Sequence, residues 1–550
     1  MFLRLFFLGV TSVVLSASSF AASKFILHGW DLSDTPPDVV AANIDRFSGM
    51  PVDGITLHVP PTIQRDGSTI HYRSIMQDPP WMYQSLERYE PSLKKIAAHP
   101  AIKESFLTCL WLYNHGNRLD WRDDAQWRRF AGNMRMFARL AKRCGQKGLF
   151  IDAEDYSKER QFYRLPHEPP YAECARLARQ RGREVFSAVF EEFPDAVVLS
   201  FWFFSACRSA LGMDDPAAAV SEAGQLWPHF INGMLDAMPM SATLVDGDEC
   251  AYKYDSRIAF NDGAIKQVMR SIPLVAPENR DKFRARMRVG FGQYIDMYVN
   301  DKKPGSSWYF GPEGGSRLEH FRRNLSDAAH TAEYVWIYGE KLSWVEWNDD
   351  SSVKIRRRYS RKKTWESALP GLSDVLAELR DPIGAAVAKA KQLRSVGCEN
   401  LYPVNVRKKW TWFDKKKSGG TFTAVAGRDS SLSTVEATGV ENGAWHVPMD
   451  SVREGDAYVV DLWIQGECDG YAEVIWRTGK APFNWKLGRF PIPVSEQCKD
   501  GRRRCTRILH VPVGVDGLMF RINAERMTPG SKASFEDIGI FKIEPPPQPP

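Results

Sequence analysis

The chain has 550 residues, a length that corresponds to two to four domains. Hydrophobic residues make up 43% and charged residues 25%, so the composition is that of a globular protein whose core needs no disulfide or metal. The net charge of +6 is spread over short basic runs at 356–358, 361–363, 415–417 and 502–504, outside any recognisable nucleic-acid-binding module. We therefore expect no nucleic-acid partner. Solvated surface charge accounts for these runs, and an acidic glycan partner is the alternative.

The first 22 residues are expected to form a signal peptide. Arg4 supplies a positive charge, residues 5–15 are apolar, and residues 19–21 have the small-x-small form of a cleavage site. An uncleaved anchor is the alternative, but the apolar run is short for one. No later segment has about 20 unbroken apolar residues, so we expect no membrane span and a secreted or periplasmic protein.

Nine cysteines follow the predicted cleavage site, so at least one must be unpaired. Cys498 and Cys505 flank a plausible loop and could form a disulfide bond. No CxxC pair and no Cys/His spacing typical of a metal site occurs. We therefore expect neither a metal ion nor a cofactor.

Eight short apolar segments alternate with helical patterns between residues 23 and 395. They lie at residues 25–31, 53–59, 104–114, 148–156, 196–205, 241–252, 289–299 and 333–341. Eight strand–helix units in about 350 residues predict an α/β fold, a (β/α)8 TIM barrel. An open doubly wound sheet gives the same alternation, but it favours fewer units and a Gly-rich loop after the first strand.

The pattern changes after residue 395. Short strands separated by Gly, Pro and Asp turns fill residues 396–543 and predict an all-β sandwich of the jelly-roll type. Residues 544–550 are rich in proline and are expected to be a disordered tail. The expected domains are thus a signal peptide (1–22), a barrel (23–395) and a β-sandwich (396–543).

Active sites of such barrels lie at the carboxyl ends of the strands, so the residues at these ends are the candidates. Carboxylates and aromatic rings gather there, which is typical of a site that cleaves sugars. The candidate catalytic residues are Asp152, Glu154 and Glu249. The candidate substrate-binding residues are His28, Trp30, Asp31, His58, Trp111, Tyr113, Tyr156, Trp202, Asp246, Tyr252, Asp296, Tyr338 and Glu340.

The fourth predicted strand runs directly into acids in the segment "GLFIDAEDY". Side chains alternate along a strand, so Phe150, Asp152 and Glu154 share one face, and an inward Phe150 would bring both acids to the barrel axis. The alternative is that both acids cap the next helix. Glu249 lies in "GDECAY", whose apolar neighbours predict partial burial and a raised carboxyl pKa, although a solvent-facing loop acid fits equally well.

Two other groups of candidates have structural alternatives. Glu340 follows an aromatic run and could form an ion pair with Lys341 or an arginine instead of binding substrate. His28 and His58 could donate hydrogen bonds to a sugar or could be core histidines. Neither a G-x-S-x-G nucleophile elbow nor an H-E-x-x-H zinc motif is present.

The runs "GWDLSDTPPDVVAANIDRFSGMPVDGITL", "LFIDAEDY", "VDGDECAYKY" and "EYVWIYGEKLSW" resemble a group of secreted bacterial glycoside-hydrolase-like TIM barrels, over roughly residues 24–350. The C-terminal part is similar to galactose-binding-like sandwiches through its strand pattern and the closing "SFEDIGIFKI". The resemblance to barrels that cleave α-glycosides implies a nucleophile at strand four, Asp152 or Glu154. It implies an acid/base at strand six, Glu249 or Asp246.

Barrels that cleave β-glycosides more often place the acid at strand four and the nucleophile at strand seven, where this chain has Asp296. The expected function is a secreted glycoside hydrolase, retaining, that acts on a poly- or oligosaccharide. A glycan-binding protein without activity is one alternative. A polysaccharide lyase that uses His28 or His58 together with a tyrosine is the other.

Overall fold

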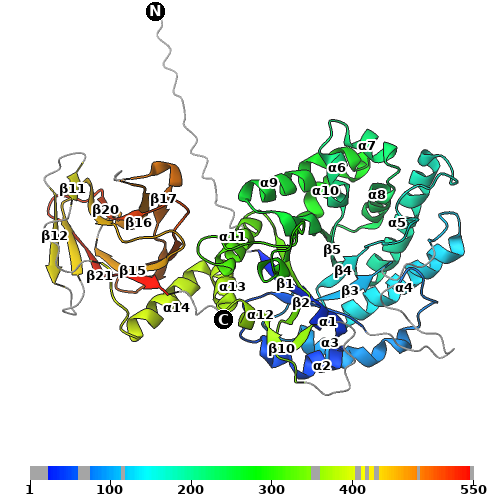
Figure 1. Ribbon diagram of the computed structural model, residues 1–550, viewed down its shortest axis with the longest axis horizontal. Helices are drawn as coiled ribbons and strands as arrows, with labels where there is room; N and C mark the ends of the chain where they lie inside the picture. Colours follow the sequence, from blue (N-terminus) through cyan, green and yellow to red (C-terminus); the bar gives the residue numbers. More distant parts are fainter. Residues whose placement is uncertain are drawn as a thin grey trace, which may run out of the picture.

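Figure 1 shows the computed structural model of the protein. It describes residues 23–59, 75–112, 118–348, 359–402, 411–414, 420–426, 433–466, 468–479 and 483–544. The predicted signal peptide and all but the first residue of the predicted tail lie outside these ranges. A barrel surrounded by helices and a β-sandwich make up the described chain (Figure 1).

The eight predicted strands form one closed parallel barrel in sequence order, which confirms the TIM-barrel prediction. The last strand pairs with the first from Lys24↔Tyr334 to Gly29↔Gly339, and this pairing closes the barrel. The strands are β1 (Lys24–Gly29), β2 (Gly54–Leu57), β3 (Phe106–Leu110), β4 (Gly148–Asp152), β5 (Val197–Ser200), β6 (Thr243–Asp246), β7 (Met287–Tyr294) and β8 (Tyr334–Gly339).

Helices cover the outside of the barrel (Figure 1). They are α1 (Trp30–Asp34), α2 (Pro37–Ala42), α3 (Glu90–Ala97), α4 (Asp124–Arg143), α5 (Tyr171–Glu192), α6 (Arg208–Leu211), α7 (Pro216–Glu222), α8 (Trp227–Ala237), α9 (Arg257–Ile265), α10 (Arg280–Arg286) and α11 (Arg317–Ala329). Within the described ranges, no helix combines the length and the apolar content that a membrane crossing requires.

Helix α4 shows how the sequence specifies this layer. The Asp123 carboxylate accepts hydrogen bonds from the backbone N–H groups of Ala125 and Gln126 and so caps the start of the helix. Its buried side chains recur at helical spacing and include Trp127, Phe130, Ala131, Met134, Phe137 and Ala138. Gly145, with φ of 70°, ends the helix in the left-handed conformation that glycine tolerates.

Aromatic side chains fill the barrel below its carboxyl-end rim. The ring of Phe150 packs against those of Phe201 and Trp336, with centroid distances of 5.2 and 5.5 Å. Phe201 and Trp336 stack on each other at 4.8 Å. Phe150 therefore faces the barrel axis, as strand alternation predicts, and the aromatic cluster closes the base of the space above it.

A connecting region follows the barrel and leads to the sandwich. It contains β9 (Leu342–Ser343), β10 (Ser360–Thr364), α12 (Trp365–Ala368), α13 (Leu372–Arg380) and α14 (Pro382–Ser395). Helix α14 lies between the two parts in Figure 1. Its Arg394 bonds the carboxylate of Asp461 on the sandwich at 3.0 Å, so the helix contacts the sheet directly.

The C-terminal strands form two antiparallel sheets, which confirms the predicted sandwich. One sheet has the order β11-β14-β20-β16-β17 and the other β12-β13-β21-β15-β19-β18. Apolar side chains from both sheets form one core between them. The strands are β11 (Thr411–Asp414), β12 (Thr421–Ala426), β13 (Ser433–Thr438), β14 (Asn442–Met449), β15 (Ala457–Gly466), β16 (Tyr471–Arg477), β17 (Arg489–Pro491), β18 (Val494–Gln497), β19 (Arg503–His510), β20 (Gly517–Glu525) and β21 (Lys532–Ile543).

All nine cysteines lie in described ranges and all are free thiols, so the predicted bond between Cys498 and Cys505 is not present. Their backbone positions explain this. Cys505 belongs to β19 and its side chain is buried in the sandwich core, whereas Cys498 lies in the preceding turn, where its N–H donates to the Arg502 carbonyl oxygen.

Candidate functional site

A cavity of about 1290 Å³ opens at the carboxyl ends of the barrel strands. Ten of the sequence-predicted site residues line it: His28, Trp30, His58, Asp152, Glu154, Tyr156, Glu249, Tyr252, Tyr338 and Glu340. The other lining residues are Ser33, Leu110, Phe201, Arg208, Cys250, Lys253, Tyr254, Tyr294 and Trp308. Acids and aromatic rings predominate, which suits a ligand with many hydroxyl groups and apolar C–H faces.

The end of β4 supplies two of the acids. Asp152 is buried, and its Oδ1 accepts a hydrogen bond from the backbone N–H of Glu154 at 2.9 Å. This contact fixes the turn that carries Glu154, whose Oε1 accepts from the Tyr156 hydroxyl at 2.5 Å. Burial, and secondarily the negative charge of Glu340, raises the pKa of Glu154, while the Tyr156 bond acts in the opposite direction.

Glu249 begins a 3-10 turn, η5 (Glu249–Lys253), that follows β6. The preceding Asp248 has φ of 33°, a left-handed conformation that Asp tolerates better than most residues. The Asp248 carboxylate accepts from the Tyr254 hydroxyl at 2.8 Å, and the Glu249 N–H donates to the Phe201 carbonyl oxygen at 3.0 Å. These contacts hold the turn against the barrel and direct Glu249 to the cavity.

The Glu249 carboxyl is protonated at neutral pH. Burial raises its pKa to about 8, and the charges of Glu154 and Asp248 contribute to this shift. Glu340 in turn acts on Glu154. Of the four carboxyl groups that line the cavity, Glu154 after β4, Glu249 in η5 and Glu340 after β8 therefore interact electrostatically, and Glu249 keeps its proton.

Glu340 is held at the end of β8 by two contacts. Its Oε1 accepts from the Tyr338 hydroxyl at 2.7 Å, and its N–H donates to the Asp296 carboxylate at 2.7 Å. The expected alternative, an ion pair with Lys341, is absent from these described residues, because the Lys341 ammonium bonds the Asn300 side chain instead. Burial raises the pKa of Asp296 to about 7. Through its bond to the Glu340 N–H, Asp296 supports the backbone of Glu340. It is not among the residues that line the cavity.

Tyrosine and histidine rings form one wall of the cavity. The Tyr338 ring stacks on His28 at 5.1 Å, on Tyr294 at 5.3 Å and on Tyr252 at 6.1 Å. The Tyr252 hydroxyl is buried and has no hydrogen-bond partner among the described residues. Burial and the charge of Glu249 raise the pKa of Tyr252 well above its usual value, so this hydroxyl is a proton donor that faces the cavity.

Both predicted histidines form hydrogen bonds within the barrel. The Nδ1 of His28 lies 2.7 Å from the Thr56 hydroxyl, and burial lowers the pKa of His28 to about 3. The Nε2 of His58 lies 2.9 Å from the Ser33 hydroxyl. Both rings line the cavity.

Four further predicted residues lie apart from the cavity lining, and Tyr113 lies outside the described residues. Trp111 packs between the barrel and its helices, against Phe130 and Trp227. Asp31 accepts from the Trp344 backbone N–H at 2.8 Å, and Asp246 accepts from the Phe203 N–H at 2.8 Å. Trp202 is half-buried and is not part of the lining. The two acids thus satisfy backbone groups of neighbouring segments.

Sequence reasoning missed several lining residues. Tyr294 lies inside the seventh predicted strand, so the alternation of side chains along that strand could have placed it on the inner face of the barrel. Lys253 and Tyr254 directly follow the predicted Tyr252 and could have been included with it. Arg208 begins α6 shortly after the fifth predicted strand, and Trp308 lies in the loop after the seventh, and no sequence motif singles out either residue.

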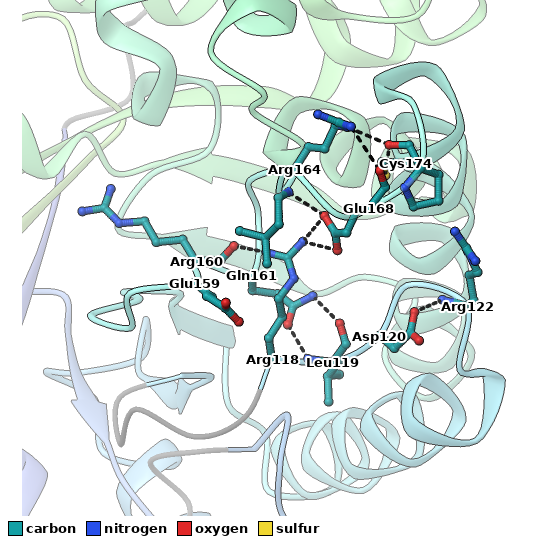
Figure 2. A network of polar contacts seen from close by, with 12 residues as sticks. Arg118, Leu119, Asp120, Arg122, Glu159, Arg160, Gln161, Arg164, Glu168 and Cys174 are labelled. Atoms are coloured by element: carbon teal, nitrogen blue, oxygen red, sulfur yellow. Dashed lines mark hydrogen bonds and ion pairs between the residues drawn. The ribbon is translucent and has the colours of Figure 1, made fainter.

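The loop that carries Glu154 and Tyr156 is anchored to the segment before α4. The Arg118 guanidinium binds both carboxylate oxygens of Glu168, at 2.7 and 2.9 Å, and donates to the Arg160 carbonyl oxygen (Figure 2). The Gln161 side chain pairs with the backbone N–H and C=O of Leu119 at 2.7 and 3.1 Å. These contacts fix the loop on the outer side of the site.

Replacing Arg118 with Gln is expected to loosen this loop. The Arg118 and Glu168 side chains are only 10% and 13% exposed, so the change leaves a shielded carboxylate without its partner. We expect a loss of about 2 kcal/mol or more of stability and faster amide hydrogen exchange over residues 153–170. Arg122→Gln is the matched control, since Arg122 is 60% exposed and lies 3.9 Å from Glu173. Equal exchange in both variants would contradict the anchoring role.

One group of potential metal ligands occurs in the described ranges. Ligand atoms of Asp255, Glu313 and His320 lie within 4.8 Å of one another, away from the cavity lining. The Arg323 guanidinium already forms ion pairs with both Asp255 and Glu313. These acids therefore have a cation in place, and the cluster holds α11 against the preceding loop.

Comparisons with known proteins give only weak similarities. A scan of protein-family models and a sequence search of curated proteins give no match. The enzymatically active domain of tailspike protein 4 from bacteriophage CBA120 matches at 11% identity and a TM-score of 0.20, over 27% of this chain and 21% of that one. The CBM22-1 xylan-binding domain of Paenibacillus barcinonensis Xyn10C matches at 12% identity and a TM-score of 0.20, over 25% and 88%.

The structure of TmCBM61 with β-1,4-galactotriose matches at 11% identity and a TM-score of 0.19, over 26% of this chain and 99% of that one. Each of these three matches spans about a quarter of the chain, and TM-scores near 0.2 carry no argument about its activity. The functional argument therefore rests on the cavity itself.

Proposed function

We propose that the protein is a secreted glycoside hydrolase that cleaves O-glycosidic bonds of a poly- or oligosaccharide with retention of configuration. The observation that carries this proposal is the pairing of Glu154 with Glu249. Both carboxyl groups face one aromatic-lined cavity and interact electrostatically, and Glu249 is the member that keeps its proton. A protonated acid beside a second carboxylate is the arrangement that glycosidic bond cleavage requires.

The two carboxyl groups have different roles in the reaction: Glu249 is the acid/base and Glu154 is the nucleophile. Glu249 donates its proton to the glycosidic oxygen as the bond to the anomeric carbon breaks, and the Glu154 carboxylate attacks that carbon and forms an ester. Glu249, now a carboxylate, takes a proton from a water molecule whose oxygen displaces Glu154 from the anomeric carbon. Both carboxyl groups return to their starting states. Asp152 positions the Glu154 backbone, and Tyr156 stabilises the Glu154 carboxylate.

The pH dependence of the reaction should report the Glu249 proton. Because the acid must be protonated and its pKa is about 8, kcat/KM is expected to fall as the pH rises through about 8. In an ordinary glutamate the proton is lost near pH 4.3, so an unshifted acid would be almost entirely ionised at neutral pH and kcat/KM would already fall at a pH well below that range. A pH–rate profile without a basic limb between about pH 7 and 9 would contradict this role.

A panel of oligosaccharides, followed by reducing-end detection and by proton NMR of the first product, tests the proposed function. Release of a product whose anomeric configuration matches the substrate supports retention, and the opposite anomer indicates inversion. Binding of a glycan without any product over long incubation would instead indicate a binding protein. Preserved activity in both Glu154→Gln and Glu249→Gln would exclude the assigned pair.

A polysaccharide lyase is the second candidate, and the Tyr252 hydroxyl is the observation that favours it. This buried hydroxyl has no hydrogen-bond partner in the part of the chain that the structure describes, and it faces the cavity, so it could donate a proton to a leaving glycosidic oxygen while a base removes a proton from the sugar. Product absorbance from an unsaturated sugar, lost in Tyr252→Phe, would support elimination. Products without this absorbance support hydrolysis.

A further inference from the structure

The cavity contains two positively charged side chains beside its carboxyl groups. Arg208, the first residue of α6, and Lys253, the last residue of η5, both line it. We propose that the glycan carries an anionic group, a carboxylate or a sulfate ester, and that Arg208 and Lys253 bind this group. The inference rests on the proposed action on glycans and names the chemical class of the substrate.

The surroundings of Arg208 leave its guanidinium available. It donates to the Tyr254 hydroxyl and lies 4.7 Å from the centre of the Tyr254 ring, and within the described residues it forms no ion pair. Asp248 is close, but the Tyr254 hydroxyl lies between them and already donates to its carboxylate. A guanidinium has five N–H donors, so most of its hydrogen-bonding capacity remains for a planar anion.

Lys253 is held by an aromatic face and not by an acid. Its ammonium lies 4.4 Å from the centre of the Trp308 ring, and among the described residues it has no carboxylate partner. Trp308 is 45% exposed and packs edge-on against Tyr294, so this wall faces both the cavity and solvent. A cation–π contact orients a lysine without neutralising it, so the charge stays available to a ligand.

The positions of the charges also orient the ligand. The two cations come from the segments that follow β5 and β6, whereas Glu154 and Glu340 come from the ends of β4 and β8. An anionic group would be repelled by the carboxylates and attracted by Arg208 and Lys253, which favours a sugar orientation that places this group above the neighbouring ends of β5 and β6. The Tyr252 hydroxyl, on the same turn as Lys253 and without a hydrogen-bond partner among the residues described, adds a neutral donor for that sugar.

Pairs of glycans that share a backbone but differ in charge test this inference. Suitable pairs are pectate with its methyl ester, and a sulfated polysaccharide with its desulfated form, each assayed for binding by calorimetry and for cleavage. We expect the acidic member to bind at least about ten-fold more tightly, and added salt to weaken that binding. The pair that shows the difference distinguishes a carboxylate from a sulfate.

Charge variants then assign the binding to the two residues. Lys253→Gln and Arg208→Gln should each weaken binding of the acidic glycan by roughly 3- to 30-fold and weaken binding of the neutral glycan less, while Lys253→Arg should retain binding of the acidic glycan. Lys95→Gln and Arg176→Gln, both exposed on outer helices, are the matched controls.

Each result is decisive. Equal binding and cleavage of neutral and acidic glycans would overturn the inference and leave the proposed function standing. Salt-sensitive binding of the acidic glycan without cleavage would uphold the inference and exclude the hydrolase. Absence of binding to every glycan would overturn both.

Discussion

Glu249→Gln is expected to lower kcat by about 10²–10⁴-fold on substrates with a poor leaving group, because glutamine cannot donate a proton to the glycosidic oxygen. The substitution preserves shape, and Glu249 is a protonated group at neutral pH, so the neutral amide should fit its site with little loss of stability. The loss of rate should shrink on an aryl glycoside whose leaving group departs without protonation. This dependence on the leaving group separates an acid from a residue that only binds substrate.

The matched control for this substitution is Glu222→Gln, because Glu222 is exposed on α7 and away from the cavity lining. We expect the control to match the wild type in rate and in Tm. An equal loss of rate on good and poor leaving groups in Glu249→Gln would contradict proton donation. It would instead assign Glu249 to substrate binding or to the structure of η5.

The strands and their inward face were predictable from sequence because they depend on short-range patterns. The eight apolar segments needed only period-two alternation and helical spacing, and Phe150, Asp152 and Glu154 lie where that alternation places them. For Glu249, the sequence was equally consistent with a partly buried and a solvent-facing side chain, because the residue lies in a loop after β6. Its burial depends on contacts with the loop after β5, which no local pattern shows.

Side-chain alternation explains one misplaced residue. The third strand was expected to span residues 104–114, but β3 ends at Leu110. Leu110 lines the cavity, so the next side chain, Trp111, points the other way and packs under the helices. Alternation from Leu110 is enough to turn the Trp111 ring away from the cavity, and the prediction placed it there because it treated the whole strand end as part of the site.

The predicted acids that do not line the cavity accept hydrogen bonds from backbone N–H groups that are distant in the sequence. Asp246 accepts from the N–H groups of Phe203 and Ser205, which belong to the loop after the neighbouring strand. Such partners become visible only when strands are placed side by side. Arg208 and Trp308 were missed for a related reason, because only the arrangement of the segments after β5 and β7 shows that they reach the rim.

Glu154→Gln is expected to reduce kcat by about 10⁴-fold or more, because the amide cannot form the glycosyl ester on which retention depends. Asp152→Asn keeps a group of the same shape that can still accept a hydrogen bond from the Glu154 N–H. We therefore expect its loss of kcat to be smaller than that of Glu154→Gln by about 10-fold or more. This order follows from the structure, in which the charge of Glu154 acts on Glu249. The reverse order would make Asp152 the nucleophile.

The same substitution should also change the pH profile of the residual activity. The negative charge of Glu154 is one cause of the raised pKa of Glu249, so removing it should shift the basic limb of kcat/KM to lower pH. Azide added to Glu154→Ala should restore turnover and give a glycosyl azide of inverted configuration, since a small anion can then occupy the place of the carboxylate. A basic limb unchanged from the wild type would show that Glu154 and Glu249 do not interact. Azide without effect on the rate would show that Glu154 is not the group that attacks the anomeric carbon.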